Sequence, residues 1–106
     1  KIMDDIIKKL ESILEERKET DSEDSYVSSL YKKGNKHICE KIIEETHEVV
    51  EATDENDERL IHETADLFFH VLVLLASHDI KYARILDELR RRFGTSGIEE
   101  KNNRNK

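Results

Sequence analysis

Residues 42–52 read IIEETHEVVEA, and their apolar positions recur at the interval of one helical face. One stripe, with spacings of three and four, carries Ile38, Ile42, Glu45 and Val49. Glu45 therefore stands where an aliphatic side chain would pack against a core, and burying an unpaired carboxylate costs free energy. We predict an amphipathic helix whose inward face carries the Glu45 carboxylate because this carboxylate has a functional role.

The composition favours one all-helical domain. The chain has 106 residues, no proline and three glycines, so long helices meet few breakers. Apolar residues make up 36% and charged residues 41%, which leaves only a small core. We therefore predict an all-α bundle of four to five helices over residues 1–106, completed by a homodimer, with a polar tail over about residues 95–106.

The charge balance and the cysteine count bear on partners and compartment. Acidic residues outnumber basic ones by 25 to 18, which argues against a nucleic-acid surface. Cys39 is the only cysteine and cannot form an intrachain disulfide. No signal peptide is visible, and the apolar run at residues 67–76 is too short to span a bilayer. We predict a cytoplasmic protein that binds no membrane, with that run as a buried core helix.

Periodicity and capping residues together place the helices. They are expected at residues 4–18, 25–33, 36–52, 57–77 and 80–93. Gly34 is either a helix stop or a kink. Asp79 is expected to cap the last helix, whose Ile85, Leu86 and Leu89 would face inward.

Two acidic pairs lie on neighbouring helices. Glu45 and Glu48 are three residues apart on one helix, and Glu63 and Asp66 are three apart on the next. Facing residues of an antiparallel hairpin have position numbers with a constant sum, and the pairs 45/66 and 48/63 share one sum. Its midpoint falls inside the polar connection at residues 53–58. The four carboxylates are thus predicted at two adjacent levels.

Four like charges in a partly buried place disfavour joint ionisation, and a cation would relieve this. Oxygen ligands without a cysteine cluster suit Mg²⁺, with Mn²⁺ also possible. The alternative is that both pairs belong to solvated helix faces, where acidic pairs are common. His70 is interpreted as a hydrogen-bonded core histidine rather than a ligand. Candidate phosphate-binding cations are Lys33, Lys36, Lys41, Arg91 and Arg92.

The chain resembles the phosphoribosyl-ATP pyrophosphohydrolase family, within the MazG-like all-α nucleotide pyrophosphohydrolases. The wider group is marked by E-E-x-x-E and E-x-x-D, present here as EETHE at residues 44–48 and ETAD at residues 63–66. The narrower resemblance rests on SY at 25–26, KG at 33–34, ADLFFHVLVLL at 65–75 and RRFGTSGIEEK at 91–101. It extends over about residues 5–104.

The resemblance implies Mg²⁺-dependent hydrolysis of phosphoribosyl-ATP to phosphoribosyl-AMP and pyrophosphate, the second step of histidine biosynthesis. We expect the domain to be free-standing rather than part of a fusion. We hypothesise that the metal ligands are Glu45, Glu48, Glu63 and Asp66. The catalytic set adds Glu44, as base or outer ligand, and Lys41. Residues proposed to bind substrate are Lys33, Lys36, Arg91, Arg92, Ser96, Lys101 and Arg104.

Three other functions fit part of this pattern. A hydrolase of dUTP or non-standard nucleoside triphosphates would share the acidic motif. A non-enzymatic helical dimerisation module would explain the apolar runs but leave the matched acidic levels as coincidence. A di-iron carboxylate bundle is disfavoured because the Glu44-x-x-His47 pair has no counterpart on the next helix.

Overall fold

The computed structural model describes the backbone of residues 2–93 and the side chains of residues 6–93. This part of the chain contains helices and no strand, which confirms the all-α prediction. The elements are α1 (Ile2–Glu16), the 3₁₀ turn η1 (Arg17–Glu19), α2 (Tyr26–Lys33), α3 (Asn35–Ala52), α4 (Asp57–Ser77) and α5 (Tyr82–Phe93).

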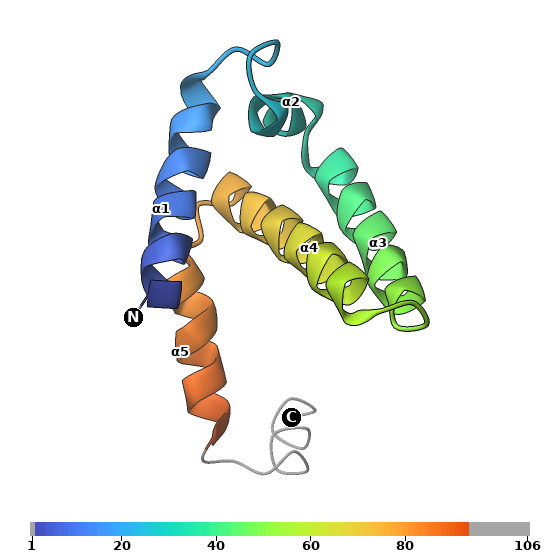
Figure 1. The fold of residues 1–106 in the computed structure, drawn as a ribbon. Coiled ribbons are helices and arrows are strands. Elements are labelled where there is room, and N and C mark those ends of the chain that lie inside the picture. The colour runs from blue at the N-terminus through green and yellow to red at the C-terminus, as the bar shows by residue number, and fades with distance from the viewer. Residues whose placement is uncertain (1, 94–106) are drawn as a thin grey trace, which may run out of the picture.

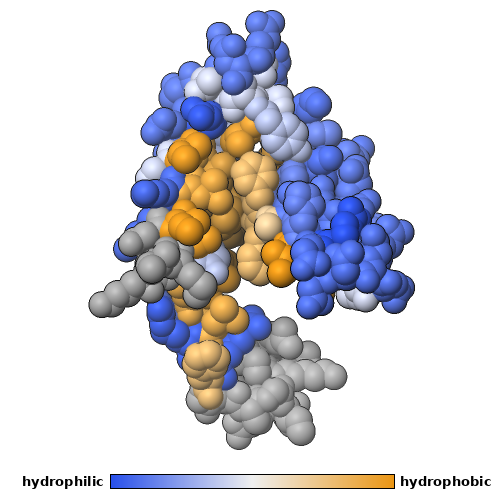
Figure 2. All heavy atoms as spheres, in the orientation of Figure 1, coloured by the Kyte–Doolittle hydropathy of each residue, from blue (hydrophilic) through white to orange (hydrophobic). Residues whose placement is uncertain are grey.

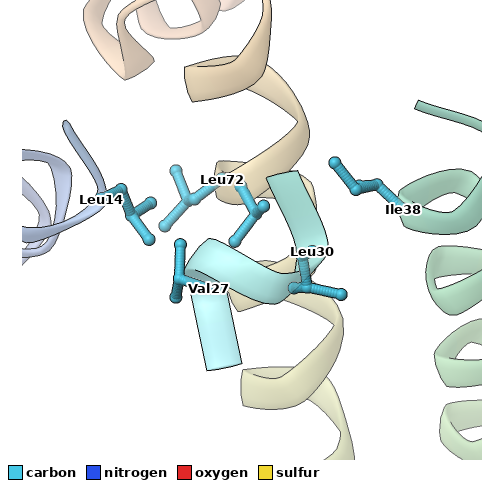
Figure 3. Close-up of a cluster of buried hydrophobic side chains, with 6 residues drawn as sticks. Leu14, Val27, Leu30, Ile38 and Leu72 are labelled. Carbon is cyan, nitrogen blue, oxygen red and sulfur yellow. The ribbon is translucent and has the colours of Figure 1, made fainter. Parts of the chain in front are cut away.

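Helices α3 and α4 form a long antiparallel hairpin, while α1 packs against α4 and α2 bridges α1 and α3 (Figure 1). The core lies where the first four helices meet (Figure 3). It consists of Leu14, Val27, Leu30, Ile38, Leu72 and Val73. Ile38 lies in the first turn of α3, and Leu72 lies in the last third of α4. The core therefore holds together the end of the hairpin that is opposite its turn. The half of the hairpin nearer its turn projects from this core.

The boundary between α2 and α3 is a true helix end. The Ser25 hydroxyl accepts a hydrogen bond from the Ser28 N–H and caps α2. Gly34 has φ of 95°, a left-handed conformation that favours glycine, and its N–H donates to the Leu30 carbonyl. Of the two predicted alternatives for Gly34, the helix stop is confirmed.

The turn between α3 and α4 also agrees with the prediction. It spans residues 53–56, and α4 begins at Asp57 and ends at Ser77 as expected. The Asn56 side chain caps α4 by accepting the Arg59 N–H at 2.9 Å.

The prediction for Asp79 is wrong. Asp79 has φ of 58° and ends α4, where its N–H and that of Ile80 donate to the carbonyls of Ala76 and Leu75. Helix α5 begins only at Tyr82, whose N–H donates to the Glu11 carboxylate at 2.6 Å. A side chain of α1 therefore supplies the acceptor that sequence reasoning assigned to Asp79.

The apolar face of α4 is only partly covered within the chain. His70, Leu72 and Val73 are buried, but Phe68 is 59% exposed, so the expected core helix is confirmed only in part. No described residue of α5 is buried, and Ile85 and Leu89 are exposed, which corrects their inward assignment. Apolar side chains gather on one face over α1, α4 and α5 (Figure 2).

A groove of about 310 Å³ runs along this face. It is lined by Ile7, Leu67, Phe68, Val71, Leu72, Tyr82, Ile85 and Leu89. Among residues 2–93, α4 alone is long and apolar enough to cross a membrane, and only 22% of its most apolar window is buried. A single helix of this length and hydropathy is weak evidence for a membrane span, because the core helix of a soluble protein has the same properties.

Candidate metal centre

The hairpin brings carboxylates of α3 and α4 near one another. Glu45 on α3 interacts with both Asp66 and Glu63 on α4. Glu48 is joined to Glu63 by a shared cation, the guanidinium of Arg59. Glu45 is therefore near Asp66 and Glu48 is near Glu63, but neither Glu45 nor Glu48 belongs to the described group of ligand atoms that lie within 4.8 Å of one another.

Glu63 and Asp66 form the α4 side of the cluster together with His62. The ligand atoms of these three side chains lie within 4.8 Å of one another, a separation that one metal ion could bridge. Glu63 is buried, and the His62 Nε2 lies 3.5 Å from the Asp66 Oδ2. Sequence reasoning missed His62, although its spacing of four residues before Asp66 places both on one helix face.

Glu45 occupies an unfavourable electrostatic position. Burial raises the pKa of its carboxyl, and the charges of Asp66 and Glu63 raise this pKa further. His70 and Lys41 act in the opposite direction but do not reverse the shift. A cation placed among these carboxylates would stabilise the ionised form of Glu45.

Arg59 is the second residue that sequence reasoning missed. Its guanidinium lies 3.1 Å from Glu63, 3.5 Å from Glu48 and 3.6 Å from Glu55. The signal was available in part, because Arg59 and Glu63 are four residues apart on one helix face. Its contact with Glu48 on α3 depends on the tertiary fold and has no local signal.

His70 is a structural histidine, as the sequence suggested. A carbonyl can only accept, so the His70 Nδ1–H donates to the Asp66 carbonyl at 2.9 Å. The Nε2 atom is hydrogen-bonded to the Tyr26 hydroxyl, also at 2.9 Å. Both ring nitrogens are engaged, and His70 fixes the backbone of Asp66 rather than offering a metal ligand.

Lys41 and Glu44 lie one turn apart on α3 and contact each other. The Lys41 Nζ donates to the Glu44 Oε1 at 3.3 Å, and this hydrogen bond raises the pKa of Lys41. Glu44 is exposed and lies next to Glu45 in the chain. Lys36 and Lys33 are exposed near Gly34, and Lys36 precedes Glu45 by nine residues, or about 13 Å of helix.

Arg91 and Arg92 are not part of the carboxylate cluster in the described chain. Both contact Glu88 near the end of α5, and their hydrogen bonds lower the pKa of Glu88 to about 2. Figure 1 shows α5 leading away from the α3–α4 hairpin. The remaining predicted residues, Ser96, Lys101 and Arg104, lie outside the described part of the chain.

Comparison with known proteins adds to this geometry. Residues 7–93 match the family model described as phosphoribosyl-ATP pyrophosphohydrolase. A phosphoribosyl-ATP pyrophosphatase of Vesicomyosocius okutanii is 55% identical over 97% of this chain and 99% of its own length. Those of Ruthia magnifica and Geobacter metallireducens are 50% and 49% identical, again over 97% of this chain, and over 99% and 95% of their own lengths. The chain belongs to the phosphoribosyl-ATP pyrophosphohydrolase family.

Proposed function

We infer that this chain hydrolyses phosphoribosyl-ATP to phosphoribosyl-AMP and pyrophosphate, the second step of histidine biosynthesis. The inference rests on the family match over residues 7–93 and on relatives of that name at about half identity over nearly the whole chain. In the reaction water adds to a phosphorus while the bond between the α and β phosphates breaks.

The observation that carries the chemistry is the carboxylate cluster, with Glu63 buried and Glu45 raised in pKa. We assign Glu45, Glu48, Glu63 and Asp66 as ligands of Mg²⁺, because hard oxygen donors suit Mg²⁺, with Mn²⁺ as an alternative. When bound, Mg²⁺ neutralises phosphate charge and lowers the pKa of a water molecule. His62 lies close enough to Glu63 and Asp66 to orient them.

The other residues of the site supply proton transfer and charge. Glu44 is exposed beside Glu45 and accepts a proton from the attacking water at its carboxylate. Lys41, held by Glu44, stabilises negative charge on the polyphosphate. We also propose as substrate contacts the residues Lys33, Lys36, Arg91, Arg92, Ser96 and Lys101.

The active form in this proposal is a homodimer in the cytoplasm. The apolar groove along α1, α4 and α5 is contiguous. Apolar residues on the surface of a monomer are usually scattered singly, and a contiguous patch marks an interaction site. A symmetric second copy would cover that groove on both chains at once. In this proposal Arg91 and Arg92 reach a carboxylate cluster, either that of their own chain or that of the partner, only when the dimer forms.

A substrate panel tests the activity. Purified protein should release pyrophosphate from phosphoribosyl-ATP with Mg²⁺ and lose this activity in EDTA, while dUTP and dCTP react poorly. Preference for dUTP or dCTP would instead support the hydrolase of non-standard nucleotides. No turnover of any of the three, without a metal-induced rise in melting temperature, would support the dimerisation module.

Paired substitutions test the ligands. Glu45→Gln should lower Mg²⁺-dependent turnover roughly 100-fold or more while the helical circular dichroism is kept. Glu40→Gln is the matched control, since Glu40 lies on the same helix and is exposed. Normal turnover of Glu45→Gln at ordinary Mg²⁺ concentrations would refute the ligand role.

A further inference from the structure

Arg59 lies on the same carboxylates that the proposed function gives to a metal ion. Its Nη1 is 3.1 Å from the Glu63 Oε2, and its Nη2 is 3.5 Å from the Glu48 Oε1. Two cations cannot share these oxygens without strong mutual repulsion. A divalent ion that binds Glu48 and Glu63 must therefore displace the guanidinium or accept weaker binding.

The position of Arg59 allows such a displacement. The Glu63 side chain is 8% exposed, whereas those of Arg59 and Glu55 are 40% and 48% exposed. The guanidinium thus lies at the rim of the cluster, between a buried carboxylate and one that faces solvent. The Arg59 Nε is buried and has no hydrogen-bond partner among the described residues, so the guanidinium is incompletely satisfied where it lies.

Glu55 offers Arg59 a second place. Its Oε2 is already 3.6 Å from the Arg59 Nη2, and its side chain is 48% exposed. Glu55 lies in the turn just before α4, so this ion pair links the turn to the first part of the helix. Rotation of the Arg59 side chain towards Glu55 would free Glu48 and Glu63 without moving either helix.

We propose that Arg59 is an internal competitor for the metal ion: it pairs with Glu48 and Glu63 until a divalent cation displaces it onto Glu55. The inference rests on the proposed function, because it needs the cluster to bind a metal. It makes Arg59 a residue that sets metal affinity and keeps buried Glu63 paired with a cation at all times.

The test measures Mn²⁺ binding to the full chain by the loss of the free-ion electron paramagnetic resonance signal. Arg59→Gln should bind Mn²⁺ about fivefold more tightly than the unchanged protein, a factor that corresponds to ~1 kcal/mol. Arg59→Lys, which keeps the charge, should stay close to the unchanged protein. Arg90→Gln is the matched control, because Arg90 also pairs with a helical carboxylate but lies on α5.

Glu55→Gln provides a second, independent measurement should Arg59→Gln fold poorly. With Glu55 neutral, Arg59 has no second place to move to, so Mn²⁺ should bind more weakly than in the control Glu58→Gln. In the Arg59→Gln background the same change at Glu55 should have a clearly smaller effect, because the two residues act together.

Melting temperatures give a readout that does not depend on turnover. In EDTA, Arg59→Gln should melt below Arg90→Gln, since Glu63 then lacks its cation. Saturating Mn²⁺ should raise the melting temperature of Arg59→Gln by more degrees than that of the unchanged protein.

The failures of the two proposals are distinguishable. If the unchanged protein binds Mn²⁺ but Arg59→Gln binds it no more tightly than Arg90→Gln, competition by Arg59 is overturned and the metal site stands. If no variant binds Mn²⁺, the unchanged protein included, the metal site itself is overturned and competition by Arg59 with it.

Discussion

Glu45 carries a charge on a face of α3 that is otherwise aliphatic, and its position was predictable. The helical period placed it among Ile38, Ile42 and Val49, and the constant sum of position numbers placed it opposite Asp66. The contact of Arg59 with Glu48 was missed because it depends on which way a long side chain turns after the helices have packed, whereas the local spacing of His62 and Asp66 could have been noticed. Spacing determines which residues share a level, but not which cation lies between them.

Glu45→Gln should stabilise the protein in EDTA. Burial and Asp66 raise the pKa of Glu45, so the folded chain holds this proton more tightly than the unfolded chain. Stability is therefore lost as the pH rises from the ordinary glutamate pKa through the raised one. Because the carboxylate is partly exposed, screening keeps the gain small, about 1–3 °C in melting temperature.

The pH dependence of that gain is the check. Thermal melts in EDTA should show the two proteins nearly equal at about pH 4 and furthest apart at about pH 8. A Glu45→Gln protein that melts below the unchanged one at pH 8 would show that Glu45 is well accommodated as a charge.

Tyr26→Phe should destabilise the fold through His70. The Tyr26 hydroxyl is hydrogen-bonded to the buried His70 Nε2 at 2.9 Å, and its loss leaves that nitrogen without its partner. Urea unfolding should show a loss of ~1 kcal/mol. The control is Tyr82→Phe, because the Tyr82 hydroxyl has no hydrogen bond to the described residues; equal losses in both would contradict the role of the Tyr26–His70 bond.

The helices themselves were largely predictable at the level of elements. Breakers and caps placed α2, α3 and α4 within about a residue of their observed bounds, because Ser25, Gly34 and Asn56 each satisfy a helix end locally. The start of α5 was not predictable, since an aspartate such as Asp79 suits both a helix start and the left-handed position after a helix end. Only the tertiary contact of α1 with α5 separates these two roles.

Glu11→Ala should loosen the start of α5 specifically. The Glu11 carboxylate accepts the Tyr82 N–H, the first of α5, and removing a helix cap costs ~1 kcal/mol. Hydrogen exchange should therefore rise in the first turn of α5, while exchange in α4 stays unchanged. Glu11→Gln keeps an acceptor oxygen and should show a smaller rise; no difference between the two variants would argue against the cap.

The way the helices of the whole molecule cover one another was the feature least predictable from the sequence. The apolar run of α4 has the same residues whether it packs inside one chain or between two chains, so periodicity alone left Phe68, Phe69, Leu72 and Leu75 as either core or dimer interface. The structure leaves Phe68 and the apolar side of α5 uncovered. The small apolar fraction of the sequence is the reason that we predict a homodimer, and this stays a prediction.

Phe68→Asp should convert the proposed dimer to a monomer, because it places a charge in the apolar groove. Sedimentation should show half the mass, and activity should fall as the dimer is lost. Ile43→Asp is a closely matched control, since Ile43 is also 59% exposed but lies on α3, outside the groove. A dimer that survives Phe68→Asp, or a monomeric unchanged protein, would contradict this interface.

The central claim is that carboxylates from α3 and α4 hold one common divalent ion. Crystals grown with Mn²⁺, with data collected at the manganese absorption edge, test it directly. The account predicts an anomalous peak between the two helices, about 2.1–2.3 Å from oxygens of Glu45, Glu48, Glu63 and Asp66. A peak bound elsewhere, or none at saturating Mn²⁺ with Arg59 still on Glu48 and Glu63, would contradict it.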